Sequence, residues 1–470
     1  MTGAAELGAR DYAGLSVTVM GLGLFGGGAA AARFFAARGA RVTVTDLRSA
    51  RELAPALEAI AGLGVRTVLG EHRAVDFEGA ALVVASPAVA PASPYLEAAR
   101  RAGARVTSEA ELFLTHCRAR VAAVTGTQGK SSTCAFLAQL LEAAGERVHL
   151  GGNIGAPLLA RVGAIAPGDR VVLELSSYQL EALPAPLPRR LSGSVEVAVL
   201  TNVLADHLER HGTLAAYRAA KLRLFELCAP GGVAIAPLEL AAALPGGLRL
   251  LRHGTGRGGR EAEVRREAGR FVLDGEVLAR PADLGVPGRF QEENVALALA
   301  AARALGIPGA VLAAALPRLV GLPHRVASLG WRAGRQVIDN GVSTTPDSTE
   351  SALLSVDPGA TLLCGGRAKK GLALDALAAL ARERGARVVA FGEAAATLAA
   401  AFARAGVAAE AHPTLAAATR RAFELTPRGA QVLFSPACSS FDAFSNFEAR
   451  ARAFQDLLPP EDLVVCCAPS

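Results

Sequence analysis

A glycine-rich turn between an apolar strand and an apolar helix is the feature that most constrains the fold of this chain. The β-branched run 121–125 predicts a buried strand, and the apolar spacing of 135–141 predicts a helix. Between them, residues 126–132 read Gly-Thr-Gln-Gly-Lys-Ser-Ser, a shorter variant of the usual phosphate-binding loop. Its N–H groups and the helix N-terminus favour phosphate, Lys130 adds a cation, and the Ser131 hydroxyl can reach Mg²⁺. We therefore predict a nucleotide site; the alternative is an ordinary turn with a chance Gly-Lys-Ser.

Length and composition predict an α/β protein of several domains. A chain of 470 residues is too long for one compact core, and its length suggests about three domains. It is 51% hydrophobic but only 5% aromatic, as expected of alanine-rich helices packed on parallel sheets. No apolar run approaches the roughly 20 residues of a membrane span, and residues 1–15 do not resemble a signal peptide. We predict no membrane insertion.

The cysteines and the charge indicate the compartment and the class of ligand. Seven cysteines are dispersed, without metal-ligand spacing apart from the adjacent pair 466–467, which predicts reduced thiols in a cytoplasm. The net charge of +6 comes from arginines that are spread along the chain rather than clustered. Without aromatic residues interleaved among the basic ones, polyanionic small molecules are the predicted partners and nucleic acid is not.

A second glycine motif lies near the N-terminus. Gly21, Gly23 and Gly26 follow an apolar strand in the spacing G-x-G-x-x-G, and Asp46 ends the next strand about 20 residues on, where a ribose ligand is expected. Alone, this unit indicates a nicotinamide-dependent oxidoreductase, but it can hold any diphosphate–ribose ligand, including a UDP-sugar. Ser86 ends a later strand of the same region; its alternative role is that of a plain turn residue.

Two further residues of the central region predict metal or proton chemistry, and a third does not do so by itself. Glu174 sits among apolar residues of a strand, where a carboxylate is costly unless it is paired or binds a cation. His207 follows Asp206 at the end of another strand, where parallel sheets bind ligands. Lys221, on a helix, would by itself be read as a solvated lysine. The alternatives are a salt-bridged core glutamate and a surface histidine.

Five motifs together resemble the Mur ligases, ATP-dependent enzymes that add amino acids to a UDP-linked cell-wall precursor. The motifs are 126–132, Gly152-Asn-Ile-Gly155, 173–179, 202–207 and Tyr217-Arg-Ala-Ala-Lys221. The resemblance implies ATP and two Mg²⁺ ions as cofactors. It implies that Lys130, Glu174, His207 and Lys221 are catalytic, and that the metals are held by Ser131, Glu174, His207 and a carbamylated Lys221. A carbamate offers the hard oxygen ligands that Mg²⁺ prefers.

The resemblance also implies an ATP site built from both halves of the chain. Its expected residues are Gly126, Thr127, Gln128, Gly129, Lys130, Ser131, Ser132, Asn294, Arg325 and Asp339. The chain departs from the family in two places. Phe290-Gln291 replaces a His-Asn pair that contacts the base, and Val342 stands where many relatives have a lysine. Asp339 and Asn340 remain rivals for the ribose contact.

The last third resembles the D-glutamate-adding branch of the family. The segment 433–454 carries the resemblance, which implies that Thr344, Lys369, Ser440 and Phe447 bind glutamate. Lys369 suits an incoming carboxylate, and Ser440 suits a neutral donor. Ala451 replaces the usual glycine after Arg450. The corresponding nucleotide-substrate residues are Leu24, Phe25, Asp46, Arg48, Ser86, Asn153, Ser176 and Gln179.

The resemblance predicts three domains: a Rossmann-like UDP-binding domain at 1–118, a central ATP-binding domain at 119–321, and a Rossmann-like amino-acid-binding domain at 322–470. The implied substrates are UDP-N-acetylmuramoyl-L-alanine and D-glutamate, joined through an acyl phosphate, and we expect a monomer. The alternatives are a paralogue that adds another amino acid such as L-glutamate, an oxidoreductase based on the first glycine motif, and a non-catalytic UDP-sugar-binding relative. The oxidoreductase leaves Lys130, Glu174 and Lys221 unexplained.

Overall fold

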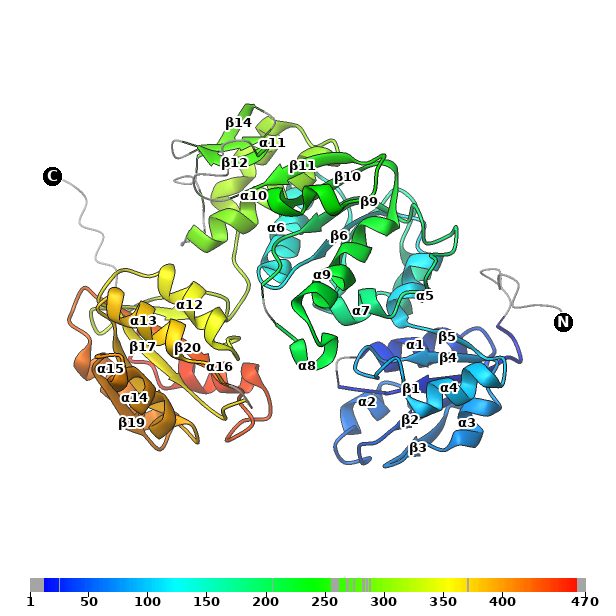
Figure 1. The fold of residues 1–470 in the computed structure, drawn as a ribbon, viewed down its shortest axis with the longest axis horizontal. Helices are drawn as coiled ribbons and strands as arrows, with labels where there is room; N and C mark the ends of the chain where they lie inside the picture. The colour runs from blue at the N-terminus through cyan, green and yellow to red at the C-terminus, as the bar shows by residue number, and fades with distance from the viewer. Residues whose placement is uncertain are drawn as a thin grey trace. The chain divides into compact units, whose positions relative to one another are not determined.

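The computed structural model has three β-sheets, each flanked by helices, which confirms the predicted α/β class (Figure 1). It describes residues 12–24, 26–204, 206–254, 262–267, 270–273, 275–280, 284, 286, 289–369 and 372–462. The chain divides into two compact units, 1–282 with 294–316, and 283–293 with 317–470. The first unit holds two of the sheets and the second unit holds the third.

The N-terminal sheet is entirely parallel, in the order β3-β2-β1-β4-β5. The order changes direction between β1 and β4, and such a switch point is where doubly wound sheets bind ligands. The strands are β1 (Ser16–Met20), β2 (Arg41–Asp46), β3 (Arg66–Leu69), β4 (Leu82–Ala85) and β5 (Arg105–Thr107). The helices are α1 (Gly27–Ala36), α2 (Ala54–Glu58), α3 (Ala74–Glu78) and α4 (Pro94–Arg101).

The central sheet has the order β14-β13-β12-β11-β10-β9-β6-β8-β7. It is parallel except at one edge, where β13 pairs antiparallel with both β12 and β14. Its strands are β6 (Arg120–Thr125), β7 (Val148–Gly152), β8 (Arg170–Glu174), β9 (Val195–Leu200), β10 (Cys228–Pro237), β11 (Arg249–His253), β12 (Val264–Glu267), β13 (Arg270–Leu273) and β14 (Glu276–Ala279). Its helices are α5 (Glu109–His116), α6 (Lys130–Ala143), α7 (Ser177–Glu181), α8 (Leu208–His211), α9 (Leu214–Leu222), α10 (Arg289–Ala304) and α11 (Gly309–Ala315).

The strand and helix predicted around the glycine-rich turn are β6 and α6. β6 is an interior strand, paired with β8 on one side and with β9 on the other, and residues 121–124 are almost fully buried. Apolar side chains therefore cover both faces of this strand, as a continuous β-branched run predicts. The carboxyl ends of β6, β8 and β9 meet at one edge of the sheet, which brings the turn close to the residues that follow the other two strands.

The third sheet, in the second unit, has the order β15-β16-β20-β17-β18-β19, and only the β15–β16 pair is antiparallel. Its strands are β15 (Ala327–Arg332), β16 (Arg335–Asp339), β17 (Thr361–Gly365), β18 (Arg387–Phe391), β19 (Ala409–His412) and β20 (Gln431–Ala437). Its helices are α12 (Pro346–Leu354), α13 (Asp375–Glu383), α14 (Ala395–Arg404), α15 (Leu415–Leu425) and α16 (Phe447–Asp456).

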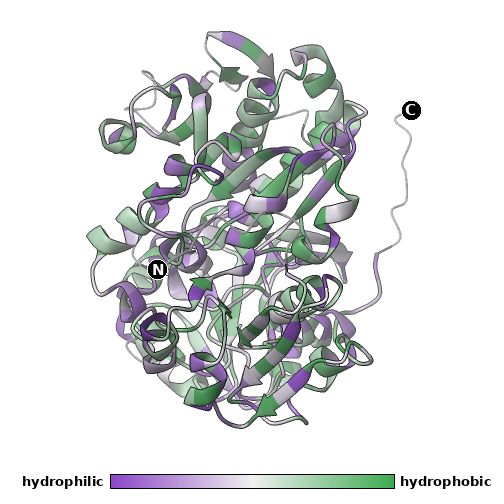
Figure 2. Ribbon diagram, turned by 90° about the vertical axis from the view of Figure 1, so that its right-hand side faces the viewer, coloured by the Kyte–Doolittle hydropathy of each residue, from purple (hydrophilic) through white to green (hydrophobic). Residues whose placement is uncertain are grey.

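Hydrophobic and hydrophilic segments alternate along many of the helices (Figure 2). This pattern is expected of helices that cover a sheet with one face and meet water with the other. Among the described residues, no helix is both long enough and apolar enough to cross a membrane.

Candidate active site

The glycine-rich loop between β6 and α6 is fastened to the end of β9. Thr127 N–H donates to the carbonyl of Asn202 at 3.0 Å, and Gln128 N–H donates to Asn202 Oδ1 at 2.9 Å. In return, Thr201 Oγ1 donates to the carbonyl of Gln128 at 2.6 Å. These bonds fix the loop backbone from the neighbouring strand, so its shape is set by the protein itself.

Two positions in the loop require glycine. Gly126 has φ 150°, and a Cβ there would lie 1.8 Å from Thr201 Oγ1. Gly129 has φ 79°, and a Cβ there would lie 2.2 Å from Asn294 Oδ1. The second contact brings a predicted ATP residue, Asn294, from α10 against the loop, where Thr133 also donates to it at 3.4 Å.

Two lysines share one carbonyl oxygen of this loop. The Lys130 ammonium donates to Gly126 O at 2.9 Å and to Thr127 O at 2.8 Å, while Lys221 Nζ donates to Gly126 O at 2.6 Å. Lys221 is only 1% exposed, and its Nζ lies 4.5 Å from the centre of the Tyr217 ring. The interpretation of Lys221 as a solvated helix lysine is therefore wrong, because α9 turns this residue toward the loop.

The surroundings of Lys221 favour its neutral amine. Burial lowers the pKa of Lys221 to about 6, and the nearby charge of Lys130 acts in the same direction. Asp206 and Glu174 oppose this effect but do not overcome it. The Lys221 side chain is thus mostly uncharged near pH 7, unlike an ordinary lysine.

Glu174, at the end of β8, carries a buried oxygen atom without a hydrogen bond. The residue is 1% exposed, and its Oε1 accepts from Asn153 Nδ2 at 2.8 Å. Its Oε2 is buried and has no hydrogen-bond partner within the described residues. A buried carboxylate oxygen without a donor is costly. It is also the hard ligand that Mg²⁺ prefers, so the environment of Glu174 fits a cation.

His207 lies in a more exposed, acidic group. It has φ 53°, its Nδ1 is 3.3 Å from the Tyr178 hydroxyl and 3.5 Å from Glu209 Oε1, and its Nε2 is 3.4 Å from Asp206 Oδ2. In the described part of the chain no three His, Cys, Asp or Glu residues group as metal ligands. The predicted metal ligands are Ser131, Glu174, His207 and Lys221. Only Glu174 and His207 are of these residue types, so the predicted set is not a group of this kind.

Asp46 organises the nucleotide-substrate residues of the N-terminal sheet. Its Oδ2 accepts from Gly23 N–H at 3.0 Å, and its Oδ1 accepts from Arg48 N–H at 2.9 Å. A Cβ at Gly21 would lie 2.8 Å from the Cβ of Ser86, so the glycine turn passes directly beside that serine. The predicted residues Asp46, Arg48 and Ser86 thus meet at the carboxyl ends of β2, β1 and β4.

Leu24 and Asn153 are further predicted contacts on this side. Leu24 is 55% exposed although it is apolar, which leaves its side chain available to a ligand. Phe25 lies outside the described residues. Asn153, after β7, holds Glu174 through both its backbone and its side chain.

Ser176 and Gln179 have a local role at the start of α7. Gln179 N–H donates to Ser176 Oγ at 3.2 Å, and Ser176 N–H donates to Gln179 Oε1 at 2.9 Å. This reciprocal pair is a capping box, which satisfies two N–H groups that a helix start leaves unpaired. Their predicted contact with substrate would be made in addition to this role.

Asp339, the expected ribose ligand, is fully buried in a network of its own. Its Oδ2 accepts from Gln455 Nε2 at 2.9 Å and lies 2.7 Å from His324 Nδ1, and its Oδ1 accepts from Gly341 N–H at 2.8 Å. The rival Asn340 donates from Nδ2 to Ser435 Oγ at 2.9 Å. Both side chains are engaged within the protein, so the choice between them stays a prediction.

Gln291, where relatives have His-Asn, contacts the backbone of a predicted ATP residue. Its Nε2 donates to the carbonyl of Arg325 at 3.0 Å. Arg325 itself lies between two non-glycine residues with positive φ, His324 at 61° and Val326 at 53°. The substitution thus ties the start of α10 to the segment that enters the third sheet.

The predicted glutamate residues gather at the carboxyl ends of strands in the third sheet. Lys369 Nζ donates to Thr344 Oγ1 at 3.3 Å, which joins the loops after β17 and β16. Arg367 and Ser439 exchange two backbone hydrogen bonds, at 2.9 and 3.0 Å, which join the loops after β17 and β20. Ser440 follows directly and is buried.

Phe447 begins α16, and one turn later the same helix carries a residue that sequence reasoning missed. Arg450 is 0% exposed, although arginine is rarely buried. In the sequence, Arg450 lies between Phe447 and Ala451, and relatives usually have glycine in place of Ala451. This pattern points to the segment, but it does not distinguish a buried arginine from a solvent-exposed one.

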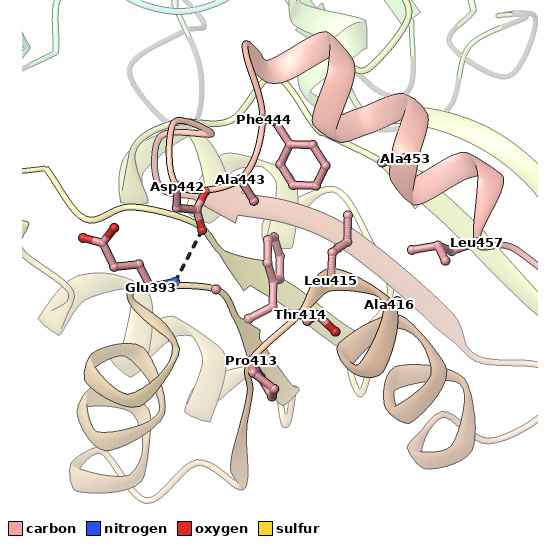
Figure 3. A pocket seen from close by; sticks show the side chains of 12 residues that line it. Glu393, Pro413, Thr414, Leu415, Ala416, Asp442, Ala443, Phe444, Ala453 and Leu457 are labelled. Atoms are coloured by element: carbon pink, nitrogen blue, oxygen red, sulfur yellow. Dashed lines mark hydrogen bonds between the residues drawn. The ribbon is translucent and has the colours of Figure 1, made fainter.

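A cavity of about 410 Å³ lies beside these loops (Figure 3). Phe391, Leu415, Phe444 and Leu457 supply apolar walls. Asp442 also lines it and accepts from Glu393 N–H at 3.4 Å. None of Thr344, Lys369, Ser440 and Phe447 lines this cavity.

Comparison with known families decides the assignment. Residues 15–108 match the Mur ligase MurD-like, N-terminal domain, and residues 124–302 match the Mur ligase middle domain. The chain belongs to the Mur ligase family. Among Mur ligases, it is 38% identical to the UDP-N-acetylmuramoylalanine–D-glutamate ligase of Geobacter metallireducens, over 95% of this chain and 97% of the relative. It is 37% identical to the ligase of that name from Anaeromyxobacter dehalogenans, over 96% and 99%.

Solved Mur ligases share the fold at lower sequence identity. UDP-N-acetylmuramate–alanine ligase from Thermotoga maritima aligns with a TM-score of 0.59 and 18% identity, over 94% of this chain and 98% of that one. The MurF ligase of the same organism, solved in complex with ADP, aligns with a TM-score of 0.56 and 17% identity, over 89% and 94%. The architecture predicted from the Mur ligase motifs is thereby confirmed.

Proposed function

We propose that this chain is an ATP-dependent ligase that adds D-glutamate to UDP-N-acetylmuramoyl-L-alanine in peptidoglycan precursor synthesis. The observation that carries the proposal is the match, over nearly the whole of both chains, to curated ligases of that name at 38% and 37% identity. The glycine-rich loop with its two lysines supports an enzyme rather than a binding protein. The reaction class follows from the family, and the particular amino acid follows from these relatives.

In this reaction, the alanyl carboxylate attacks the γ-phosphorus of ATP, which gives an acyl phosphate and ADP. The Lys130 ammonium and the N–H groups at the start of α6 would bind the transferring phosphoryl group. The amine of glutamate then attacks the acyl carbon and phosphate leaves. Lys369 and Thr344 would hold a carboxylate of glutamate, with Ser440 as a neutral donor and Phe447 as an apolar wall.

Mg²⁺ would be held by Ser131, Glu174, His207 and Lys221. The buried Glu174 oxygen without a donor is the observation that fits this assignment best. When bound, Mg²⁺ neutralises charge on the phosphate oxygens. The remaining ATP contacts stay as the family implies them, through loop residues 126–132 with Asn294, Arg325 and Asp339.

Lys221 would serve the metal site as a carbamate. The neutral amine would attack CO₂: an N–C bond forms as the electron pair of one C=O π bond moves onto oxygen, the proton of the nitrogen passes to solvent water, and an anion replaces a potential cation. A neutral amine is required for this step, and the lowered pKa of Lys221 supplies it near pH 7. Burial then protects the carbamate from water.

On the nucleotide side, we assign Leu24, Phe25, Asp46, Arg48, Ser86, Asn153, Ser176 and Gln179 to UDP-substrate binding. We also propose that the enzyme acts as a cytoplasmic monomer.

The test is phosphate release from ATP with UDP-N-acetylmuramoyl-L-alanine, measured with D-glutamate and, in parallel, with L-glutamate. We expect release that depends on D-glutamate and a product whose mass has increased by one glutamyl residue. Equal use of L-glutamate would assign a different member of the family. Absence of release with either amino acid would refute the proposal.

A further inference from the structure

The guanidinium of Arg450 is bound by the backbone of the loops around it. Its Nη1 donates to Gly365 O at 3.3 Å and to Cys438 O at 2.9 Å. Its Nη2 donates to Gly341 O at 3.3 Å and to Ser343 O at 3.1 Å. One side chain thus supplies four hydrogen bonds to carbonyl groups that are far apart in the sequence.

The four carbonyls belong to three loops that follow neighbouring strands of the third sheet. Gly341 and Ser343 follow β16, Gly365 ends β17, and Cys438 follows β20. Because these strands are adjacent in the order β16-β20-β17, their loops lie side by side at the carboxyl edge of the sheet.

Each of these loops carries one of the proposed glutamate residues. Thr344 follows Ser343 directly, Lys369 lies a few residues after β17, and Ser440 lies two residues after Cys438. The fourth, Phe447, stands three residues before Arg450 on α16, and therefore on the same side of that helix. Arg450 thus connects all the segments that would contact the amino acid.

The guanidinium fits tightly among these loops. Gly366 has φ 125°, and a Cβ there would lie 2.2 Å from Ser439 O and 2.9 Å from Arg450 Nη1. The space beside the guanidinium is therefore kept open only by the absence of a side chain at residue 366. Arg450 cannot shift without moving the loops that it binds.

The charge of Arg450 is compensated by carbonyl dipoles rather than by a carboxylate. Within the described part of the chain it forms no ion pair, and its buried Nε has no hydrogen-bond partner. Asp442 attracts it at longer range. A buried positive charge of this kind raises the potential around the neighbouring loops, which favours an anionic ligand there.

We propose that Arg450 is a positioning residue for the amino-acid substrate, which holds the loops of Thr344, Lys369 and Ser440 in the arrangement that binds glutamate. The inference rests on the proposed function. The planar guanidinium, with its fixed fork of donors, can reach four carbonyls at once, whereas a lysine ammonium has three donors at a single point. Lysine at this position therefore keeps the charge but not the connection between the loops.

The test compares Arg450→Lys with Arg452→Lys on the same helix, whose side chain is 72% exposed and lies 3.7 Å from Glu448. For each protein, the KM values for D-glutamate, ATP and the nucleotide substrate are measured. The acyl phosphate is also trapped with hydroxylamine, without glutamate. We expect Arg450→Lys to raise the KM for D-glutamate at least about tenfold, the loss of roughly one charged hydrogen bond, and to change the hydroxamate rate less than about twofold. Arg452→Lys should change neither.

Three outcomes separate the possibilities. If the wild-type enzyme forms neither hydroxamate nor product, the proposed function itself fails. If the wild-type enzyme is active and Arg450→Lys leaves the KM for D-glutamate unchanged, or raises all three KM values equally, the positioning role is refuted.

If Arg450→Lys does not fold, amide hydrogen exchange on the wild-type enzyme with ADP and D-glutamate decides. Protection of the loops at 341–344, 365–369 and 438–440 together supports the role, and protection of one loop alone contradicts it.

Discussion

Replacing Gly126 by alanine tests whether the glycine-rich loop is shaped by the end of β9. The new Cβ would stand 1.8 Å from Thr201 Oγ1 and 3.2 Å from Asn202 N, at a backbone φ of 150°. Either the Thr201 side chain or the loop must move. Moving Thr201 breaks its 2.6 Å hydrogen bond to the Gln128 carbonyl, and moving the loop displaces the oxygen that both lysines bind.

The size of the effect can be worked out from these contacts. An alanine in this backbone conformation costs about 1–3 kcal/mol, and overpacking adds about 1–3 kcal/mol. The lost hydrogen bond adds about 1 kcal/mol. Together these costs lower the free energy of unfolding by roughly 3–7 kcal/mol, and the thermal midpoint by roughly 10–20 °C. The KM for ATP should rise as well, because the backbone N–H groups of the loop are displaced from the arrangement proposed to bind phosphate.

The assay is thermal unfolding together with ATP kinetics, and Gly145→Ala is the matched control. Gly145 lies just beyond the other end of α6 at φ 83°, but a Cβ there meets nothing within 4 Å. Gly145→Ala should therefore show the backbone cost alone, about 1–2 kcal/mol. In a double-mutant cycle, Thr201→Ala should recover part of the loss in Gly126→Ala by removing the clashing hydroxyl.

Two results would refute this reasoning. One is a Gly126→Ala enzyme that is no less stable than Gly145→Ala. The other is a double variant whose stability loss equals the sum of the two single losses, because additivity would mean that Thr201 does not oppose the new methyl group.

Three further predictions follow from the same structure. Lys221→Ala should lose activity, and added bicarbonate should not restore it, because the proposed carbamate needs the lysine amine. An alanine variant with the full rate in the phosphate-release assay would refute the carbamate role of Lys221. Ser176→Ala should cost about 1 kcal/mol of stability by opening the capping box of α7, which a lower thermal midpoint would reveal; an unchanged midpoint would contradict it. Burial alone would raise the pKa of Asp76, but hydrogen bonds from Arg66 and Arg73 lower it overall. The stabilisation from Asp76 is therefore complete above the ordinary aspartate pKa of about 4 and is lost as the pH falls through the lowered folded value. Between pH 7 and pH 2, the thermal midpoint should fall less for Asp76→Asn than for the wild type. If the two curves of thermal midpoint against pH are parallel, the contacts of Asp76 with Arg66 and Arg73 contribute nothing to stability.

The local elements of the site could be predicted from the sequence, because glycine, lysine and β-branched residues determine them over short distances. The strand–turn–helix around Lys130 is an example, and so is the placement of Glu174 in a buried strand. The domain boundaries at 118 and 321, by contrast, remain predictions.

Burial of charged side chains could not be predicted in the same way. The helical spacing around Lys221 does not say which face of α9 meets the loop, since that depends on β6 and β9. Arg450 is harder still, because its four acceptors come from loops about 12 to 110 residues away. Such residues are placed by tertiary structure alone.

The carbonyl oxygen of Gly126 links the two lysines of the loop. As long as Lys221 remains an amine, two donors compete for this oxygen, and the adjacent ammonium of Lys130 is held back toward the backbone. The proposed carbamate would put an anion in place of that amine, and the anion would attract the Lys130 ammonium. A single backbone atom thus couples the chemical state of Lys221 to the position of Lys130.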